Sequence, residues 1–169
     1  SRGLAHIGVL HAFEEYGYPI HAICGVSSGS LIGGLYAAGL PISTLIDVLP
    51  SLSWRSFTSF HLSKRGMVSS KKIQLLVETY IGKMKLKDCK IPFATVATNI
   101  NTAEPRIFFQ SDHLVSEVIR ASCSFPGVFS PMKIDDQYYV DGGIFQHLPV
   151  KPLTDQGIQH VVGVDVVPS

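Results

Sequence analysis

Gly25-Val26-Ser27-Ser28-Gly29 follows a short apolar run, His21–Cys24, and precedes a stretch of small and apolar residues that ends at Gly39. This order predicts a strand, a sharp turn and a helix with Gly-x-Ser-x-Gly on the turn, which is the context of a nucleophile elbow. The hydroxyl of Ser27 would then point out at the helix N-terminus, where free N–H groups and the helix dipole favour an oxyanion. The alternative is a plain Gly/Ser-rich turn, and the pentapeptide alone does not separate the two.

The composition indicates a globular domain. Of the 169 residues, 46% are hydrophobic and 16% are charged, the formal net charge is +1 and the mean hydropathy is +0.25. This charge gives no indication of a nucleic-acid partner. The hydropathy predicts either a well-buried sheet or an exposed apolar face suited to lipid. A local basic cluster is interpreted as a solvated face or as an anionic-membrane contact; it consists of Lys83, Lys85, Lys87 and Lys90.

The three cysteines, Cys24, Cys89 and Cys123, are odd in number and widely spaced. This pattern favours neither a disulfide framework nor a metal site. There is no secretory signal and no apolar run long enough to span a bilayer. We therefore expect a reducing, cytoplasmic compartment and no metal or other cofactor. The sequence gives no signal for an oligomeric state. It begins at Ser1 without a methionine, which indicates a processed product or a fragment.

Alternating patterns along the chain predict an α/β fold. Helices are expected over 3–16, 28–38, 42–49, 70–81, 113–122 and 151–156. Strands are expected where β-branched and aromatic residues gather, at 19–24, 92–99, 106–109, 137–140 and 161–166. Strands that alternate with helices indicate a mostly parallel sheet covered on both faces.

Residues 50–67 differ from the rest, because they are serine-rich, aromatic and weakly periodic. We interpret them as a surface loop that carries Trp54, Phe57 and Phe60 outward or over the site. Such a loop could serve as a lid or face lipid, or it could cover a small satellite core.

A serine hydroxyl needs a group that takes its proton before it can act as a nucleophile. Two histidines, His147 and His160, follow Asp141, so the chain order Ser…Asp…His is formally available. However, His160 comes at the N-terminal end of the strand expected over 161–166, whereas sites in open α/β sheets lie at the carboxyl ends. The other histidines are interpreted as core-edge, surface or loop residues; they are His6, His11, His21, His61 and His113.

Asp141 is the better-placed base. It ends the expected strand over 137–140, and Gly142-Gly143 allow a sharp turn at the edge where Ser27 also lies. The alternative is a plain Asp-Gly turn. Asp135-Asp136 is interpreted as a polar hairpin turn between two short arms.

Taken together, Gly25–Ser30 and Asp141-Gly142-Gly143 resemble the patatin-like phospholipase family, whose enzymes use a Ser–Asp dyad without histidine. Three further segments support the resemblance. Arg2–Leu10 is similar to the end of the family's glycine-rich oxyanion loop and the helix after it, Ala121–Phe129 to its Ala-Ser-x-Ala/Ser-x-Pro block, and Leu148–Val150 to the segment after Asp-Gly-Gly. The resemblance covers nearly the whole chain in the right order.

This resemblance implies a three-layer α/β/α sandwich with a mostly parallel central sheet. It implies hydrolysis of acyl esters in phospholipids or lysophospholipids through an acyl-serine, with Ser27 as nucleophile and Asp141 as base. Arg2 and Gly3 would close the oxyanion loop, to which Ser28 adds its N–H. The motif glycines are Gly25, Gly29, Gly142 and Gly143. The substrate is then a lipid ester, and peripheral membrane contact is an option.

The family's loop normally begins with several glycines, and a strand, before the position of Ser1. We therefore expect residues 1–169 to form a single patatin-like domain without its first strand and glycine-rich loop. Two alternatives to a Ser–Asp hydrolase stay open. One is a Ser-His-Asp esterase using His147, where the family often has asparagine. The other is a lipid-binding or regulatory module of the same fold with little turnover.

Overall fold

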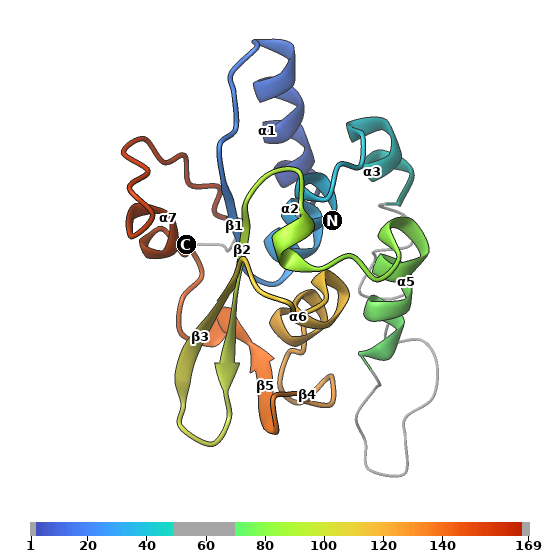
Figure 1. Cartoon of the computed structure of the whole chain (residues 1–169), viewed down its shortest axis with the longest axis vertical. Helices are drawn as coiled ribbons and strands as arrows, with labels where there is room; N and C mark the ends of the chain where they lie inside the picture. Colours follow the sequence, from blue (N-terminus) through green and yellow to red (C-terminus); the bar gives the residue numbers. More distant parts are fainter. Residues whose placement is uncertain (1–2, 49–69, 167–169) are drawn as a thin grey trace.

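The computed structural model describes residues 3–48 and 70–166 of the chain (Figure 1). The helices are α1 (Gly3–Glu15), α2 (Ser28–Ala37), α3 (Ile42–Val48), α5 (Lys71–Ile81), α6 (Val115–Ser122) and α7 (Lys151–Thr154), with short 3-10 turns η2 (Leu86–Asp88) and η3 (Gly142–Ile144). The strands are β1 (Ile23–Gly25), β2 (Phe93–Asn99), β3 (Glu104–Phe109), β4 (Met132–Ile134) and β5 (Gln137–Asp141). The expected aromatic loop over 50–67 lies outside the described residues.

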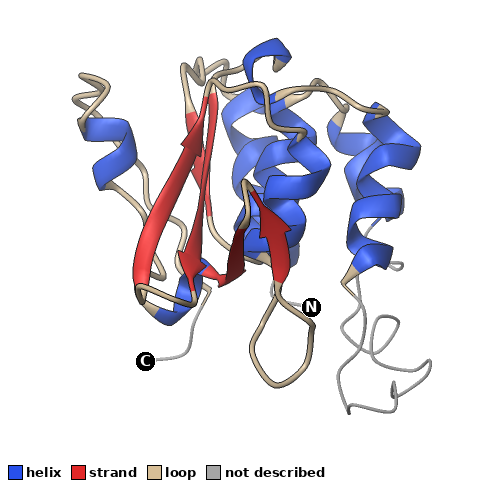
Figure 2. Cartoon of the chain, turned by 60° about the horizontal axis from the view of Figure 1, so that its bottom comes forward, coloured by secondary structure: helices blue, strands red, loops and turns tan. Residues whose placement is uncertain are grey.

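The central sheet has five strands and is mixed (Figure 2). β1 and β2 are parallel, whereas the pairs β2–β3, β2–β5 and β4–β5 are antiparallel. The helices packed on this sheet confirm the α/β class. The antiparallel pairs make the sheet less parallel than the alternation of helices and strands predicts, because short turns join β2 to β3 and β4 to β5 without a crossover helix.

β2 is the strand that positions the site. β3 pairs with β2 along most of its length, so β1 and β5 share the other edge. Gly25 pairs with Thr95, and Asp141 pairs with Ala97. Because β1 runs parallel and β5 antiparallel to β2, the C-terminal ends of both strands point toward each other. They stop on either side of Val96.

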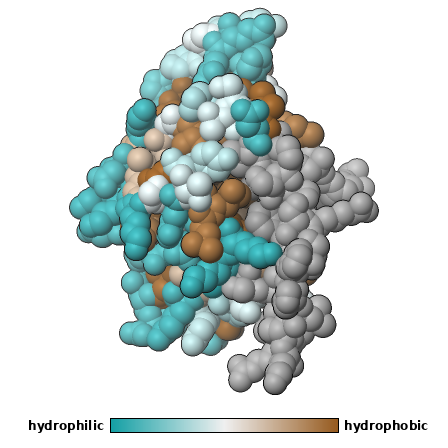
Figure 3. All heavy atoms as spheres, turned by 90° about the vertical axis from the view of Figure 1, so that its right-hand side faces the viewer, coloured by the Kyte–Doolittle hydropathy of each residue, from teal (hydrophilic) through white to brown (hydrophobic). Residues whose placement is uncertain are grey.

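The core lies between the sheet and the helices packed on it. α2 and α6 pack directly on the strands, and α1, α3 and α5 pack against them (Figure 1). α2 packs closely on its neighbours, since a Cβ at Gly34 would lie 2.6 Å from Ile119 and 3.0 Å from Phe93. Leu35, Phe93 and Ile119 are fully buried there. On the outer face beside α5, apolar side chains occur in small groups among polar ones (Figure 3).

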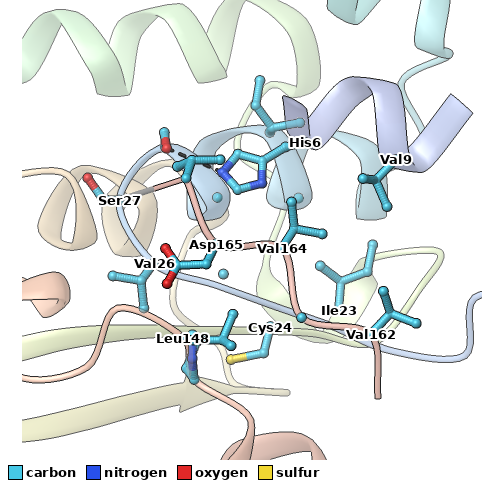
Figure 4. A pocket seen from close by; sticks show the side chains of 18 of the residues that line it. His6, Val9, Ile23, Cys24, Val26, Ser27, Leu148, Val162, Val164 and Asp165 are labelled. Atoms are coloured by element: carbon cyan, nitrogen blue, oxygen red, sulfur yellow. Dashed lines mark hydrogen bonds between the residues drawn. The ribbon is translucent and has the colours of Figure 1, made fainter. Parts of the chain in front are cut away.

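The strand predicted over 161–166 is wrong. These residues have no regular secondary structure, and Val162 is 66% exposed. A strand forms only where its backbone pairs with a neighbour in a ladder, and residues 161–166 pair with none of the described strands. The segment instead runs beside the cavity next to β1 (Figure 4).

The hairpin predicted around Asp135-Asp136 is confirmed. These residues join β4 to β5 and have φ of 49° and 59°, as a two-residue type I′ turn requires. Asp135 Oδ2 accepts one hydrogen bond, from Arg106 Nη2 at 2.7 Å, and lies 2.8 Å from His113 Nε2. These contacts tie the hairpin to β3 and to the start of α6.

The basic cluster is partly neutralised. Lys85 and Lys87 form ion pairs of 3.0 and 2.7 Å with Asp112, and both partners are largely exposed. Such pairs contribute little to stability. They favour the interpretation of this cluster as a solvated face over that of an anionic-membrane contact.

The described helices are too short to cross a bilayer. The longest, α1, has 13 residues, whereas a membrane span takes about 20 apolar residues. No candidate span is found among the residues that the structure describes.

Candidate active site

Ser27 occupies a strained turn between β1 and α2. Its φ of 54° and ψ of −121° lie in a region that residues other than glycine rarely adopt. The N–H of Gly29 donates to the carbonyl oxygen of Val26 at 2.9 Å and closes the turn. A Cβ at Gly25 would collide with the carbonyl oxygen of Gly29, so the first motif glycine is required by this close approach. The turn has the geometry of a nucleophile elbow.

Buried hydroxyl groups support the elbow from β2. Thr95 Oγ1 donates to the carbonyl oxygen of Gly25 at 3.1 Å and hydrogen-bonds to Ser30 Oγ at 2.7 Å. Thr95 and Ser30 are both fully buried. The end of β1 and the first turn of α2 are therefore fastened to the same strand.

Asp141 lies at the end of β5 with its carboxyl group buried, the residue being only 2% exposed. Oδ1 accepts a hydrogen bond from the N–H of Gly143 at 2.8 Å. Oδ2 has no hydrogen-bond partner among the described residues. Burial raises the pKa of Asp141, against the opposing effects of the Ser27 hydroxyl, the Gly143 N–H and His147. The Ser27 hydroxyl thus acts to lower the pKa of this carboxyl group, although no hydrogen bond joins Ser27 to Oδ2 in the described part of the chain.

The two glycines after Asp141 have separate roles. A Cβ at Gly142 would collide with the carbonyl oxygen of Val96, at the point where β1 and β5 stop. Gly143 supplies the N–H that orients Asp141. The turn after β5 can therefore enter the junction between the two strands only with glycine at 142.

Ser27 and Asp141 line one cavity of about 1020 Å³. Its wall is largely apolar and comes from β1, from α1 and from residues 158–166. Figure 4 shows Ser27 and His6 beside Val164 and Asp165 of the last of these segments. Three apolar residues near Asp141 line the same cavity and are partly exposed; they are Phe125, Ile144 and Leu148, at 51, 47 and 38%.

Two of the three residues expected to bind an oxyanion are described. Gly3 begins α1 and lines the cavity. Ser28 is the first residue of α2, and helix geometry leaves its N–H without an intrahelical partner. Arg2 lies outside the described residues.

His6 is a cavity residue that the sequence interpretation assigned to the core edge or surface. Its Nε2 lies 3.4 Å from Ser28 Oγ, and burial lowers the pKa of His6 below its usual value. The spacing could have found it, because His6 is three residues after Gly3 and therefore shares a helix face with it.

His147 and His160 both line the cavity. Within residues 3–48 and 70–166, neither ring hydrogen-bonds to Ser27 or Asp141. His147 is exposed, and its electrostatic effect on Asp141 lowers the pKa of that carboxyl group. Ser27, Asp141 and both histidines thus line one cavity, and among the described residues no hydrogen bond joins either histidine to Ser27 or Asp141.

The model of the patatin-like phospholipase family matches residues 1–154. An NTE family protein of Mycobacterium tuberculosis is 33% identical over 169 residues, which cover 98% of this chain and 46% of the relative. Lysophospholipase NTE1 of Saccharomyces cerevisiae is 31% identical over 182 residues, covering 98% of this chain and 10% of the relative. The chain thus spans about half of the mycobacterial relative and a tenth of the yeast one. The crystal structure of VipD from Legionella pneumophila has a TM-score of 0.70 at 12% identity, covering 86% of this chain and 44% of VipD, a likeness of fold alone.

Proposed function

This chain belongs to the patatin-like phospholipase family, and from that premise we propose that it is a serine acyl hydrolase of phospholipids or lysophospholipids. One observation carries the proposal. The buried carboxyl group of Asp141, with Oδ2 unpartnered among the described residues, lies beside the strained elbow that presents Ser27. The name of the yeast relative favours lysophospholipids as the first substrates to test.

In the proposed reaction Asp141 Oδ2 takes the proton of the Ser27 hydroxyl as its oxygen attacks the ester carbonyl. The tetrahedral intermediate collapses to an acyl-serine, and the protonated Asp141 gives its proton to the departing alcohol. Asp141 then takes a proton from water, whose oxygen attacks the acyl-serine. The fatty acid leaves, and Ser27 regains its proton.

The surroundings of Asp141 suit a carboxylate to this role. A carboxylate is a weak base in water, but burial raises the pKa of Asp141 and so makes it a stronger one. The Gly143 N–H holds Oδ1 and leaves Oδ2 free for Ser27. We assign the oxyanion to the N–H of Ser28 together with Gly3 and Arg2. Loss of one such donor typically costs ~10²–10³-fold in rate.

The cavity supports a lipid substrate. Phe125, Ile144 and Leu148 line it beside Asp141 and remain partly exposed. Side chains of this kind could accommodate an acyl chain and could bring the site to a lipid surface. We therefore propose peripheral membrane contact at this rim.

The free cysteines Cys24, Cys89 and Cys123 support a reducing, cytoplasmic compartment.

A fluorophosphonate probe tests the nucleophile directly. We expect it to label the purified protein at Ser27, identified by peptide mass spectrometry, because the probe reacts with an activated serine. The same preparation should hydrolyse p-nitrophenyl esters and lysophosphatidylcholine. An unlabelled protein that still binds lipid vesicles would instead favour the lipid-binding or regulatory module.

Replacement of His147 by alanine separates the Ser–Asp dyad from a Ser-His-Asp triad. We expect H147A to keep most of the wild-type kcat on p-nitrophenyl butyrate, because its ring hydrogen-bonds to neither Ser27 nor Asp141 in the described part of the chain. H160A, which alters another cavity histidine, is the matched control. Loss of a general base typically costs ~10²–10⁴-fold, so a fall of that size in H147A alone would establish the triad.

A further inference from the structure

Ser122 ends α6, and Cys123 and Ser124 follow it. The first two contact Ser27, and the third contacts Asp141. We propose that Ser122, Cys123 and Ser124 are positioning residues that hold the nucleophile and the base in register, an inference that rests on the proposed function. These residues belong to the Ala121–Phe129 block, which is separate from both the elbow and the Asp-Gly-Gly turn and has no role in the proposed reaction so far. We call them the 122–124 bracket.

Ser122 fastens the backbone of Ser27 to β2. The N–H of Ser27 donates to Ser122 Oγ at 3.1 Å, and Ser122 Oγ donates to the carbonyl oxygen of Val96 at 2.7 Å. A hydroxyl group can donate once and accept twice, so one buried side chain makes both bonds. Val96 stands where β1 and β5 stop, and Ser122 thus links the elbow to the junction between the two strands.

Cys123 holds the other backbone polar group of Ser27, its carbonyl oxygen. Its Sγ donates to the carbonyl oxygen of Ser27 at 3.1 Å. Burial, together with the charge of Asp141, raises the pKa of Cys123 well above its usual range, which keeps the group a thiol and therefore a donor. The Ser27 carbonyl also accepts the N–H of Leu31 at 3.1 Å. Both backbone polar groups of Ser27 are therefore satisfied.

Ser124 connects the bracket to the base. Its carbonyl oxygen accepts the N–H of Asp141 at 3.0 Å. Ser124 Oγ in turn donates to the carbonyl oxygen of Arg120 at 2.7 Å and lies 3.1 Å from Ser70 Oγ. The bracket is thus anchored in α6, and its three consecutive residues reach Ser27 on one side and Asp141 on the other.

The strain at Ser27 explains why such a bracket is needed. A serine at φ 54° and ψ −121° stays there only when its surroundings hold it. Without the Ser122 hydroxyl, the Ser27 N–H would lose its protein partner, and the peptide could rotate toward a relaxed conformation. The Ser27 oxygen would then move away from Asp141 Oδ2. A misplacement of about 1 Å can cost ~10²-fold in rate.

The test compares S122A with S116A in the purified protein. Ser116 is also buried on α6, but its Oγ donates to Glu78 Oε1 at 3.0 Å. We expect S122A to lower kcat on p-nitrophenyl butyrate by ~10–10²-fold with KM unchanged, and to lower the rate constant of fluorophosphonate labelling equally. S116A should keep the wild-type kcat, and S122T, which retains a hydroxyl, should recover most of the activity.

Several outcomes would overturn the bracket: wild-type kcat in S122A, an equal loss in S116A, or a loss in S122A that appears only in KM. If S122A does not fold, C123A removes one weak donor and should lower kcat about 2- to 10-fold; an unchanged kcat would refute the inference. S27A separates a failure of the proposed function from a failure of the bracket alone. Full turnover by S27A refutes the proposed function and the bracket with it, whereas an inactive S27A beside a fully active S122A refutes the bracket alone.

Discussion

Replacing Ser27 by alanine will abolish esterase activity, with kcat on lysophosphatidylcholine and p-nitrophenyl butyrate lower by ~10³–10⁶-fold. Alanine removes the only atom that would form the acyl bond. Among the described residues, the contacts of Ser27 with Ser122 and Cys123 are made by its backbone, and these remain. The stability of the fold should therefore change little, and the loss of activity should come from the missing nucleophile.

The measurement is steady-state hydrolysis combined with fluorophosphonate labelling and a thermal melt. An exposed serine on α3, Ser43, provides the matched control, and S43A should behave as the wild type in all three. Turnover by S27A equal to that of the wild type would show that the elbow does not hold the nucleophile.

Replacing Asp141 by asparagine will have two effects of opposite sign. We expect kcat to fall by ~10²–10⁴-fold, the usual contribution of a general base. We also expect a higher Tm at pH 7–8. Asparagine keeps an oxygen for the Gly143 N–H and removes a buried charge whose Oδ2 has no partner among the described residues.

The pH dependence of Tm shows whether the ionised Asp141 carboxylate destabilises the folded protein. The pKa of Asp141 is raised in the folded protein, so the stability it contributes is present below its unfolded pKa and is lost as pH rises through the folded pKa. The Tm of D141N should therefore exceed that of the wild type by most at pH 7–8, and this difference should shrink as pH falls through the raised pKa of Asp141. The wild-type kcat/KM should fall over the same interval, because only the ionised carboxylate can accept the Ser27 proton.

Asp112 is the matched control for charge. It is exposed, and its hydrogen bonds to Lys87 and Lys85 lower its pKa to about 2, so the D112N substitution should not raise Tm at pH 7–8. A D141N protein that melts below the wild type at pH 8 would mean that the Asp141 carboxylate stabilises the fold. Undiminished turnover by D141N would remove it from the reaction.

Local patterns predicted most elements of the fold. The amphipathic spacing over 3–16 and 70–81 became α1 and α5, and the β-branched run over 92–99 became β2. Each depends on residues within one or two turns or a few alternations. The valine-rich segment over 161–166 has an equally strong strand composition, but it forms no ladder, because pairing needs a neighbouring edge that composition does not specify.

Some features of the candidate site could likewise be predicted from local sequence, and others could not. Gly-x-Ser-x-Gly and Asp-Gly-Gly are short turns whose glycines are required by nearby backbone, so both could be found from the sequence. The role of the 122–124 bracket could not, since its residues act on Ser27 and Asp141, which belong to other elements. The bracket lay within a segment that the family resemblance had already marked, but its contacts with Ser27 and Asp141 cross between helix and sheet.

The sequence by itself determined that Ser27 would stand on a strand–turn–helix elbow and Asp141 on a glycine turn at the end of a strand, because those conformations depend on neighbouring residues. Only the tertiary structure decided that β1 and β5 share one edge of β2 and stop on either side of Val96. That arrangement brings the elbow and the carboxyl group together. It depends on strand direction and register between distant segments, which hydrogen bonding and core packing select only when the whole sheet has formed.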